Sequence, residues 1–481
     1  MADKEGLVRE LGALLGGDGL LHRPEDVIVY EYDYGLDRAV PDAVVFPSSA
    51  EQVAEVVKIA RRYDLPLVAR GAGTGIAGGA VPVGGGIVVA LARLKRILAI
   101  DYENRVALVE PGVVNLDITA AVQEGGYFFA PDPSSQKAST IGGNVGNNAG
   151  GPHCLAHGVT VNHILGMEIV LADGEIVWLG GAAPDSPGYD LPGFVVGSEG
   201  TLGIVTKVLV RLMRQPEAVR TFLAVFDTVD AASASVSEII AAGMLPAALE
   251  LMDRPALRAI EAAFQAGYPP EAGAVLLVEV DGLSESMEVQ EGEIEAICRR
   301  HGALRFQAAA DAEARAKLWA ARKGAASAMG RIAPNYYLHD AVVARSKLPA
   351  VLSEVIAIGE AHGLPVANIF HAGDGNLHPM IVFDVREPGI MPRVMQAGRE
   401  MLHACVKAGG TISGEHGIGV EKNEFMPWIF SDDDLAVMDR ARSAFDPDRR
   451  LNPGKVLPSG ATCHDVNVKP RGVVKNPELW I

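Results

Sequence analysis

The sequence has little cysteine, and it lacks both a long apolar run and an excess of positive charge. Its four cysteines show no C-x-x-C spacing of the kind found in metal and iron–sulfur sites; they are Cys154, Cys298, Cys405 and Cys463. This pattern fits a reducing compartment and excludes an iron–sulfur cluster made by this chain alone. Any electrons that the protein handles must therefore leave by another route.

The lack of a long apolar run indicates where the protein is located, and the lack of excess positive charge limits the partners that it can bind. No apolar run approaches the roughly 20 residues of a membrane helix, and the first residues do not form an apolar signal region. We therefore expect a cytoplasmic protein, with peripheral docking on the inner face of a membrane left open. The formal net charge of −18 argues against nucleic acid as a partner, because that affinity comes mainly from clustered Lys and Arg. An anionic substrate would need a local basic pocket.

Length and composition predict a globular protein of two or more domains. A chain of 481 residues is too long for one ordinary hydrophobic core. Hydrophobic residues make up 49% and charged residues 21% of the sequence, which is typical of folded proteins and not of disordered ones. From about Glu217, glycine loops give way to long helical stretches around residues 231–242 and 311–329. This change of texture predicts a domain boundary near residue 216.

A helix and a strand precede the first notable glycine tract. Ser49 and Gln52 have the spacing of a capping box, and the helical pattern that follows them stops before Pro66. Residues 67–70 then have a strand pattern. Because they lead directly into glycines at 71–79, this strand is expected to deliver the chain to a turn-rich loop.

The tract at residues 71–79 is the first candidate phosphate site, because many backbone N–H groups can converge there on one anion. Residues 73–78 also satisfy the dinucleotide pattern G-x-G-x-x-G. A Rossmann site requires a helix to begin within that pattern, whereas residues 81–86 contain proline and three glycines. We reject the NAD interpretation and keep the phosphate loop.

Two further glycine tracts lie in the same region. Residues 139–151 are too rich in glycine to predict a packed element, and their asparagines can both donate and accept hydrogen bonds. A linker is the alternative, but linkers favour Ser, Lys or Glu among their glycines, and this tract has no charge. Residues 197–206 form a third loop that runs into a strand, after a predicted hairpin with its turn at Asp173-Gly174. Three such loops suit a large folded-up cofactor.

The sharpest chemical signal lies at residues 368–383, where Asp374-Gly375 separates two apolar runs and predicts a hairpin turn. With that turn, His371 pairs directly with His378, at about 5 Å between Cβ atoms. This spacing suits one shared metal ion. Taken singly, each histidine is more simply explained as a hydrogen-bonded core residue.

A second tract, residues 409–419, places Glu415 and His416 among glycines. Glu415 would complete a set of two histidines and one glutamate, which is typical of catalytic divalent sites with open positions. These ligands do not distinguish Zn, Mn and Fe. A capping or ion-pair role for Glu415 and His416 is the alternative.

Together the motifs resemble the FAD-linked oxidases, flavoproteins with a PCMH-type (vanillyl-alcohol-oxidase-type) flavin domain. Six spaced motifs carry the resemblance: residues 70–74, 139–151, 197–206, 371–378, 414–417, and 445–447 with 451–455. It implies an α+β fold in three parts. These are an FAD-binding domain with a helical lead-in over residues 1–216, an α+β substrate and metal domain over 217–457, and an extension over 458–481.

The resemblance also implies roles for individual residues. Non-covalent FAD binding is expected at the three loops and at an asparagine from the C-terminal segment: Arg70, Gly71, Ala72, Gly73, Thr74, Gly75, Gly78, Pro131, Asp132, Ser139, Gly142, Gly143, Asn144, Gly146, Asn147, Ala149, Gly150, Glu199, Gly203, Ile204 and Asn452. The implied metal ligands are His371, His378 and Glu415. His416 is the implied base. Arg322 is implied to contact the substrate carboxylate, whereas its helical pattern alone favours a solvated face.

The implied reaction is the oxidation of a small D-2-hydroxy acid to the 2-keto acid, with proton removal by His416 and hydride transfer to flavin N5. A divalent metal would lower the pKa of the substrate hydroxyl. Relatives act on glycolate, D-lactate or D-2-hydroxyglutarate, and those acting on the last have polar residues where this chain has Met380 and, by alignment, Leu338. Apolar residues there would leave a second carboxylate unpaired. We therefore expect glycolate or D-lactate, with D-2-hydroxyglutarate as the alternative.

Expected partners are the anionic substrate and an electron acceptor, either a protein or a quinone. In glycolate oxidase assemblies of this family the acceptors include a second flavin subunit and an iron–sulfur subunit. A chain that is active only within such a complex, or that only helps to assemble it, is the rival interpretation. An aldonolactone or aromatic-alcohol oxidase would lack the two-histidine hairpin. The electron acceptor and any homo-oligomer are left open.

Overall fold

The computed structural model describes residues 3–183 and 187–458, which form two compact units. Among these residues, the first unit comprises 3–150, 159–215 and 415–458, and the second comprises 151–158 and 216–414. The chain enters the main part of the second unit at Gln215–Pro216, next to the predicted boundary. The C-terminal segment from residue 415 groups with the first unit, whereas the sequence analysis had assigned residues 217–457 to one domain. The predicted extension lies outside the described residues, apart from residue 458.

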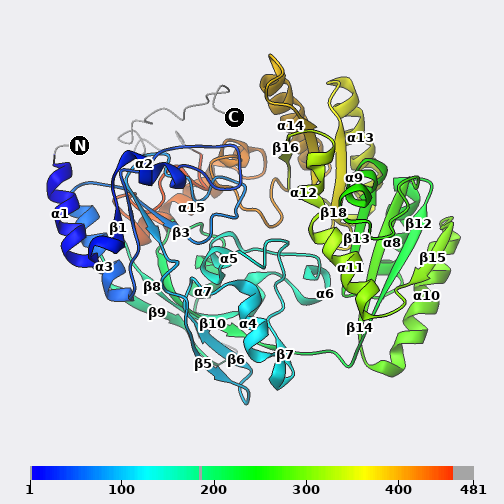
Figure 1. The fold of residues 1–481 in the computed structure, drawn as a ribbon, viewed down its shortest axis with the longest axis horizontal. Coiled ribbons are helices and arrows are strands. Elements are labelled where there is room, and N and C mark those ends of the chain that lie inside the picture. The colour runs from blue at the N-terminus through cyan, green and yellow to red at the C-terminus, as the bar shows by residue number, and fades with distance from the viewer. Residues whose placement is uncertain (1–2, 184–186, 459–481) are drawn as a thin grey trace. The chain divides into compact units, whose positions relative to one another are not determined.

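The first unit contains three sheets (Figure 1). One has the order β1-β2-β4-β3, with β4 parallel to both β2 and β3. The second is antiparallel, in the order β5-β6-β10-β8-β9, and β7 pairs with β11 in the third. The strands are β1 (Leu20–Leu21), β2 (Ala43–Val45), β3 (Leu67–Arg70), β4 (Ile87–Ala90), β5 (Ile97–Asp101), β6 (Val106–Val109), β7 (Tyr127–Phe128), β8 (Ile164–Val170), β9 (Ile176–Gly180), β10 (Ile204–Arg211) and β11 (Met213–Arg214).

Helices cover these sheets. The α-helices of the first unit are α1 (Lys4–Leu15), α2 (Pro24–Val27), α3 (Ala50–Arg62), α4 (Asn115–Val122), α5 (Ile141–Asn147), α7 (Leu191–Val195) and α15 (Asp432–Phe445). Apolar side chains of α1 and α3 pack on the four-stranded sheet and form one buried core. Among the described residues, no helix is both long and apolar enough to cross a membrane.

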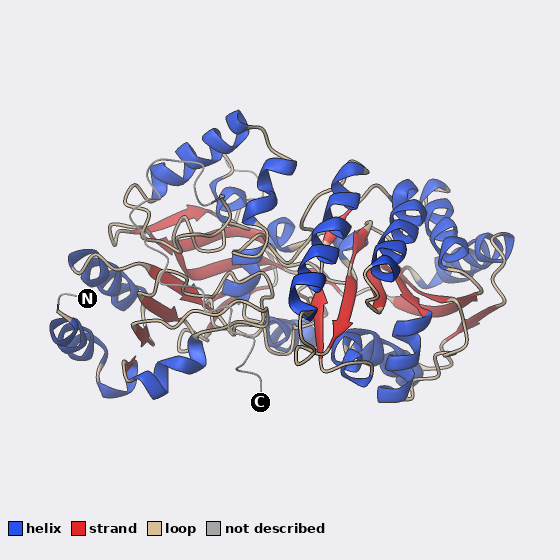
Figure 2. Cartoon of the chain, turned by 90° about the horizontal axis from the view of Figure 1, so that it is seen from above, coloured by secondary structure: helices blue, strands red, loops and turns tan. Residues whose placement is uncertain are grey.

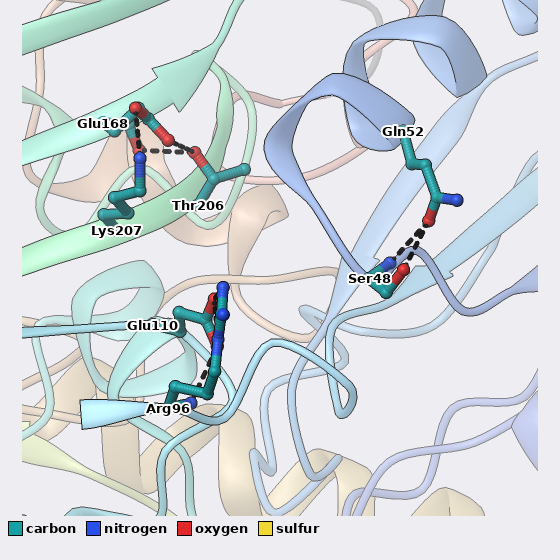
Figure 3. Close-up of polar contacts among 7 residues, drawn as sticks. All are labelled: Ser48, Gln52, Arg96, Glu110, Glu168, Thr206 and Lys207. Atoms are coloured by element: carbon teal, nitrogen blue, oxygen red, sulfur yellow. Dashed lines mark hydrogen bonds and ion pairs between the residues drawn. The ribbon is translucent and has the colours of Figure 1, made fainter. Parts of the chain in front are cut away.

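Helix α3 begins where the sequence predicted it. Ser49 accepts a hydrogen bond from the N–H of Gln52 at 3.2 Å. The reciprocal bond of a capping box goes instead to the preceding residue, because the Gln52 side chain accepts from the Ser48 N–H at 2.7 Å and from its hydroxyl at 2.9 Å (Figure 3). The N-terminus of α3 is therefore capped by two consecutive serines, Ser48 and Ser49.

The β8–β9 hairpin is confirmed, with a wider turn than predicted. The N–H of Leu171 donates to the Glu175 carbonyl at 2.9 Å, so three residues form the loop. Gly174 has a φ of +87°, in the left-handed region that such a loop needs. Glu168 of β8 accepts hydrogen bonds from Thr206 and Lys207 of the neighbouring strand β10, each at 2.9 Å (Figure 3).

The second glycine tract is not a loop throughout, which corrects the sequence analysis. Residues 141–147 form helix α5, which ends at Asn148 with a left-handed φ of +52°. Ile141 and Val145, one helical turn apart, are both completely buried in the core of the first unit. These two anchors outweigh the poor helix propensity of the glycines between them.

The second unit is built on one antiparallel sheet in the order β15-β12-β14-β13-β18-β19-β17, with β16 and β20 joined through β18. Its strands are β12 (Ala218–Phe226), β13 (Ala248–Asp253), β14 (Ala274–Gly282), β15 (Arg305–Ala308), β16 (Asn335–Leu338), β17 (Ala341–Val342), β18 (Val366–His371), β19 (Asn376–Leu377) and β20 (Pro379–Phe383). Strands β13, β19 and β20 are buried along their whole length, and β12, β14 and β18 are buried over most of theirs. This burial explains the nearly continuous apolar sequences of the longer central strands.

Helices flank this sheet on both sides (Figure 2). They are α6 (Cys154–His157), α8 (Val229–Ala241), α9 (Arg254–Phe264), α10 (Met287–Arg300), α11 (Ala312–Lys323), α12 (Ala325–Ala328), α13 (Leu348–Ala361) and α14 (Ile390–Lys407). One face of the sheet shares a core with α9, α11 and α12. Helices α8 and α10 contact strands of the same sheet.

The histidine hairpin has a different register from the predicted one. His371 pairs with Asn376, so residues 372–375 form a four-residue turn. The predicted pairing of His371 with His378 is therefore wrong by two positions. Because a shift of two keeps every side chain on its face, the two imidazoles still lie on one face, with ring centroids 5.0 Å apart.

Candidate active site

The glycine loops meet within the first unit. A Cβ atom on Gly71 would lie 2.4 Å from the Thr140 hydroxyl, and one on Gly75 would lie 3.7 Å from the Asn147 side chain. The third loop joins them, because the N–H of Glu199 donates to the carbonyl of Gly146 at 2.8 Å. The Thr140 hydroxyl leaves no room for a Cβ atom at position 71, so glycine there allows the first two tracts to pack together, and the bond from Glu199 adds the third.

A fourth segment, residues 416–419, packs on these loops. The Asn147 side chain donates to the His416 carbonyl at 2.7 Å. The Glu199 carboxylate accepts from the N–H groups of Ile418 at 2.7 Å and Gly419 at 2.9 Å. Burial raises the pKa of Glu199, while these bonds and Lys455 act against the shift. Glu199 therefore attaches the segment that contains His416 to the glycine loops.

The C-terminal segment closes the same region. The Asn452 side chain donates to the carbonyl of Gly79 at 2.8 Å and to that of Glu199 at 2.6 Å. Lys455 is completely buried and donates to the Val81 carbonyl at 2.6 Å. Desolvation lowers the pKa of Lys455 to about 7, although nearby carboxylates counteract this effect. The return of residues 452–455 is what places the C-terminal segment in the first unit.

Arg70 lies at the end of β3 and is nearly buried. Its guanidinium donates to the Tyr32 carbonyl at 2.7 Å and lies 5.5 Å from the centre of the Tyr30 ring. Asp33 is buried nearby, and desolvation raises its pKa to about 6 in spite of the positive charge of Arg70. Arg70 therefore helps to hold residues 30–33 beside the first glycine loop.

Helix α5 leaves room beside its backbone. A Cβ atom on Gly143 would find only the Thr140 hydroxyl, at 3.6 Å, and one on Gly146 would find only the Cα of Glu199, at 3.9 Å. Gly142 differs, because its Cβ would lie 2.6 Å from Pro111. The glycines at 143 and 146 thus keep open a strip of backbone that a flat, polar ligand can approach.

In the second unit, a buried carboxylate joins two of the predicted site residues. Glu250 on β13 lies directly opposite His371 on β18. It accepts a hydrogen bond from His371 Nδ1 at 2.7 Å, and its other oxygen forms an ion pair with Arg322 of α11. All three side chains are almost inaccessible to solvent, so the predicted solvated face for Arg322 is wrong.

The second histidine lies beside a different carboxylate. His378 Nε2 is 3.3 Å from Oδ1 of the buried Asp340. The other oxygen of Asp340 accepts from the Ser413 hydroxyl and from the Gly414 N–H, both at 2.8 Å. Gly414 directly precedes Glu415 in the chain, so Asp340 fixes the backbone from which Glu415 extends.

Comparison with known proteins identifies the family of the chain. Residues 41–180 match the family described as "FAD binding domain", and residues 215–456 match "FAD linked oxidases, C-terminal domain". The second match covers half of the chain. The chain belongs to the FAD-linked oxidase family. This membership confirms the predicted resemblance and makes the protein an FAD-binding enzyme.

Curated relatives of this FAD-linked oxidase are similar over nearly their whole length. "Glycolate oxidase subunit GlcD" of Escherichia coli (strain K12) is 44% identical over 463 residues, which are 96% of this chain and 93% of that protein. The protein of the same name from Bacillus subtilis (strain 168) is 42% identical over 90% of this chain and 93% of the length of that protein. A "D-lactate dehydrogenase" of Anaerostipes hadrus is 32% identical, with coverages of 87% and 90%.

Solved structures confirm the predicted PCMH-type α+β fold. p-Cresol methylhydroxylase, solved with substrate bound, has a TM-score of 0.78 at 19% identity, covering 95% of this chain and 97% of its own. 4-Ethylphenol oxidase from Gulosibacter chungangensis has a TM-score of 0.77 at 21% identity, with coverages of 95% and 98%. At such low identity, the likeness concerns the fold alone.

Every cofactor residue predicted for this FAD-linked oxidase belongs to the first unit. Three of these residues, Pro131, Ala149 and Ile204, also make contacts within the protein. The Pro131 carbonyl accepts from the Asn115 side chain at 3.0 Å, and the Ala149 carbonyl accepts from the Thr160 hydroxyl at 2.7 Å. Ile204 lies in a hydrophobic core, so its side chain is a packing residue.

Sequence reasoning missed two acidic residues of the second unit, Glu250 and Asp340. A signal for Glu250 was present, because it is the only charged residue in the otherwise apolar stretch 247–252. A carboxylate inside a buried strand needs a partner. The identity of that partner, 121 positions away in the sequence, could not be read from the chain.

Proposed function

We propose that this FAD-linked oxidase oxidises a small D-2-hydroxy acid, either glycolate or D-lactate, to the corresponding 2-keto acid. One observation supports this most strongly: two buried histidines lie on one face of the hairpin, and Glu250 links one of them to a buried arginine. The names of the relatives, glycolate oxidase subunit and D-lactate dehydrogenase, support the same substrate class.

Arg322 is the residue proposed to bind the substrate carboxylate. It is 4% exposed, and among the described residues its Nε has no hydrogen-bond acceptor. A buried donor without an acceptor is costly. A substrate carboxylate would supply the missing acceptor and could bind the planar guanidinium in a bidentate manner.

His371, His378 and Glu415 are the residues proposed to hold a divalent cation. The bond from His371 Nδ1 to Glu250 leaves Nε2 as the nitrogen available for a metal. Asp340, which lies 3.3 Å from His378, accepts a hydrogen bond from the N–H of Gly414, the residue that precedes Glu415. Two imidazoles and one carboxylate suit Zn, Mn or Fe. Such a cation would lower the pKa of a substrate hydroxyl bound to it.

His416 is the proposed base that takes the hydroxyl proton. Its backbone is bonded to Asn147 of the glycine loops, and the next residues are bonded to Glu199. This attachment keeps the imidazole on a segment fixed to the FAD-binding unit. When bound, FAD would accept the substrate's C2 hydrogen as a hydride at N5. The glycine loops, Arg70 and Asn452 are the groups proposed to surround the cofactor, without a covalent link.

The choice of a small substrate rests on two apolar side chains. Leu338 on β16 lies directly opposite Met380 on β20, and Met380 packs in the same core as Leu318 and Trp319 of α11. A second substrate carboxylate beside this pair would be desolvated without a partner. We therefore favour glycolate or D-lactate over D-2-hydroxyglutarate.

The reduced cofactor must pass its electrons on. Because a close relative is named as a subunit, we propose that this chain works beside partner proteins that accept electrons, a second flavin subunit and an iron–sulfur subunit, or delivers them to a quinone.

The deciding experiment is anaerobic reduction of the bound flavin, followed by its absorbance. Purified protein is mixed with glycolate, D-lactate, L-lactate or D-2-hydroxyglutarate, before and after treatment with a chelator, and the His416→Ala variant is tested in parallel. We expect bleaching by glycolate or D-lactate that is lost on chelation and slowed at least about 100-fold by the variant. No bleaching by any acid, with FAD and metal bound, would refute the proposed activity of the chain.

A further inference from the structure

Two His–Glu–Arg groupings, each centred on a buried glutamate, lie on the same face of the sheet of the second unit. The Glu250 triad consists of His371, Glu250 and Arg322. The Glu279 triad consists of His153, Glu279 and Arg315. In the register of β13 and β14, Ala248 pairs with Glu279, so the two glutamates are diagonal neighbours. The arginines are seven residues, about two turns, apart on α11 and share one face of it.

The two glutamates differ in how fully they are bonded. Glu279 accepts hydrogen bonds from Arg315 through two nitrogens at 2.8 and 2.9 Å, and from Trp319 at 2.5 Å. It also accepts from Thr221 at 2.5 Å and contacts His153 at 3.2 Å. Among the described residues, Glu250 has only His371 and Arg322 as side-chain partners.

Both partners of Glu250 have roles in the proposed function, so the following inference rests on that proposal. We infer that Glu250 is a positioning residue that serves the metal-ligating histidine and the substrate-binding arginine at once. One carboxylate oxygen holds the His371 ring with a proton on Nδ1, which leaves the Nε2 lone pair for the cation. The other oxygen holds the Arg322 guanidinium by charge.

The shared carboxylate also fixes the distance between the two functions. Glu250 lies on β13 in the middle of the sheet, and it is completely buried. A carboxylate in such a position cannot turn toward water, so its two oxygens remain directed at His371 and Arg322. Metal binding and recognition of the substrate carboxylate are therefore coupled through one rigid group and not through a mobile loop.

The test compares Glu250→Gln with Glu279→Gln, a matched change at the neighbouring buried carboxylate. Each variant is stripped of metal and titrated with Mn²⁺ and with Zn²⁺ by calorimetry, and its thermal midpoint is measured. We expect Glu250→Gln to weaken cation binding by about 10- to 100-fold, whereas Glu279→Gln binds like the wild type. At saturating metal, Glu250→Gln should also raise KM for glycolate or D-lactate more than it lowers kcat, because Arg322 contributes to uniform substrate binding.

A second measurement does not depend on whether Glu250→Gln folds. Nitrogen-15 NMR of histidine-labelled, metal-free wild type, with the His371 signal assigned by comparison with His371→Gln, should show the neutral ring protonated on Nδ1. An Nε2-protonated ring, or unchanged cation binding by folded Glu250→Gln, would overturn the inference and leave the proposed function standing. A wild type that binds neither cation would instead refute the metal part of the proposed function, and the inference with it.

Discussion

The Glu250 triad and the Glu279 triad place the same three residue types against the same helix, yet they are suited to different tasks. Glu279 receives hydrogen bonds or ion pairs from four side chains of the second unit, which leaves its oxygens little capacity for anything else. Glu250 receives two, and Nε of its arginine has no acceptor among the described residues. A saturated carboxylate stabilises the fold, whereas an incompletely bonded grouping can still receive a ligand.

The largest expected effect separates the two arginines. Arg322→Ala should lower kcat/KM for the 2-hydroxy acid by about 1000-fold, or about 4 kcal/mol, because a desolvated charge partner of the substrate is lost. Arg315→Ala, two turns away on α11, should leave kcat/KM within about threefold of the wild type and lower the thermal midpoint. Steady-state kinetics and thermal unfolding of both variants give the comparison. Equal losses of activity would mean that the two triads do not differ in task.

A smaller effect concerns pH and the Glu279 triad. Burial alone would raise the pKa of Glu279, but hydrogen bonds from His153 and Arg315 and their positive charge lower it to about 2 from the usual 4.5. Because the folded-state pKa is depressed, this stabilisation is present above the unfolded pKa and is lost as the pH falls through the folded value. The wild type's advantage in unfolding free energy over Glu279→Gln should therefore narrow by about 2 kcal/mol between pH 6 and pH 3.

Denaturant unfolding of the wild type and Glu279→Gln at a series of pH values provides this measurement. Asp384, a solvent-accessible carboxylate paired with Arg386, is the control: Asp384→Asn should change stability far less, because water screens an ion pair at the surface. An advantage of the wild type over Glu279→Gln that stays constant down to pH 3 would show that Glu279 is not held ionised by its partners.

The smallest expected effect tests whether the hydrogen-bonding capacity of the Glu279 carboxylate is saturated. Thr221→Val removes one donor from Glu279 while keeping the shape of the side chain, and Trp319 and Arg315 remain bonded to the carboxylate. The free energy of unfolding should fall by about 1.5 kcal/mol, the lower end of the range for a hydrogen bond to a charged group, because the other donors remain. Chemical denaturation measures it, with cation affinity as the control. A loss above about 4 kcal/mol would mean that the remaining donors do not compensate.

Much of the local structure could be predicted from the sequence, because short-range signals determine it. The start of α3 at Ser49, the strand before the first glycine tract and the β8–β9 hairpin all depend on residues a few positions apart. The helix at residues 141–147 was missed, since its two buried anchors act through tertiary packing that outweighs glycine's low helix propensity.

The candidate site was predictable in its residue types and less so in its geometry. The two-residue turn at Asp374-Gly375 was a sound local expectation, but β17 pairs with β19 and the Val343 N–H donates to the Gly375 carbonyl at 3.0 Å, which favours a longer turn. Glu250 reaches His371 only because β13 and β18 are neighbours in the sheet. Such long-range strand pairing leaves no mark on either segment alone.

The return of residues 452–455 to the first unit has a consequence for biosynthesis. Asn452 bonds to the carbonyls of Gly79 and Glu199, which leave the ribosome hundreds of residues earlier. The unit that begins first is therefore finished last, after all described strands of the second unit have been made. During translation the glycine loops are made long before the segment that completes their packing. A chain cut short after residue 414 would contain every described residue of the second unit but would lack part of the first.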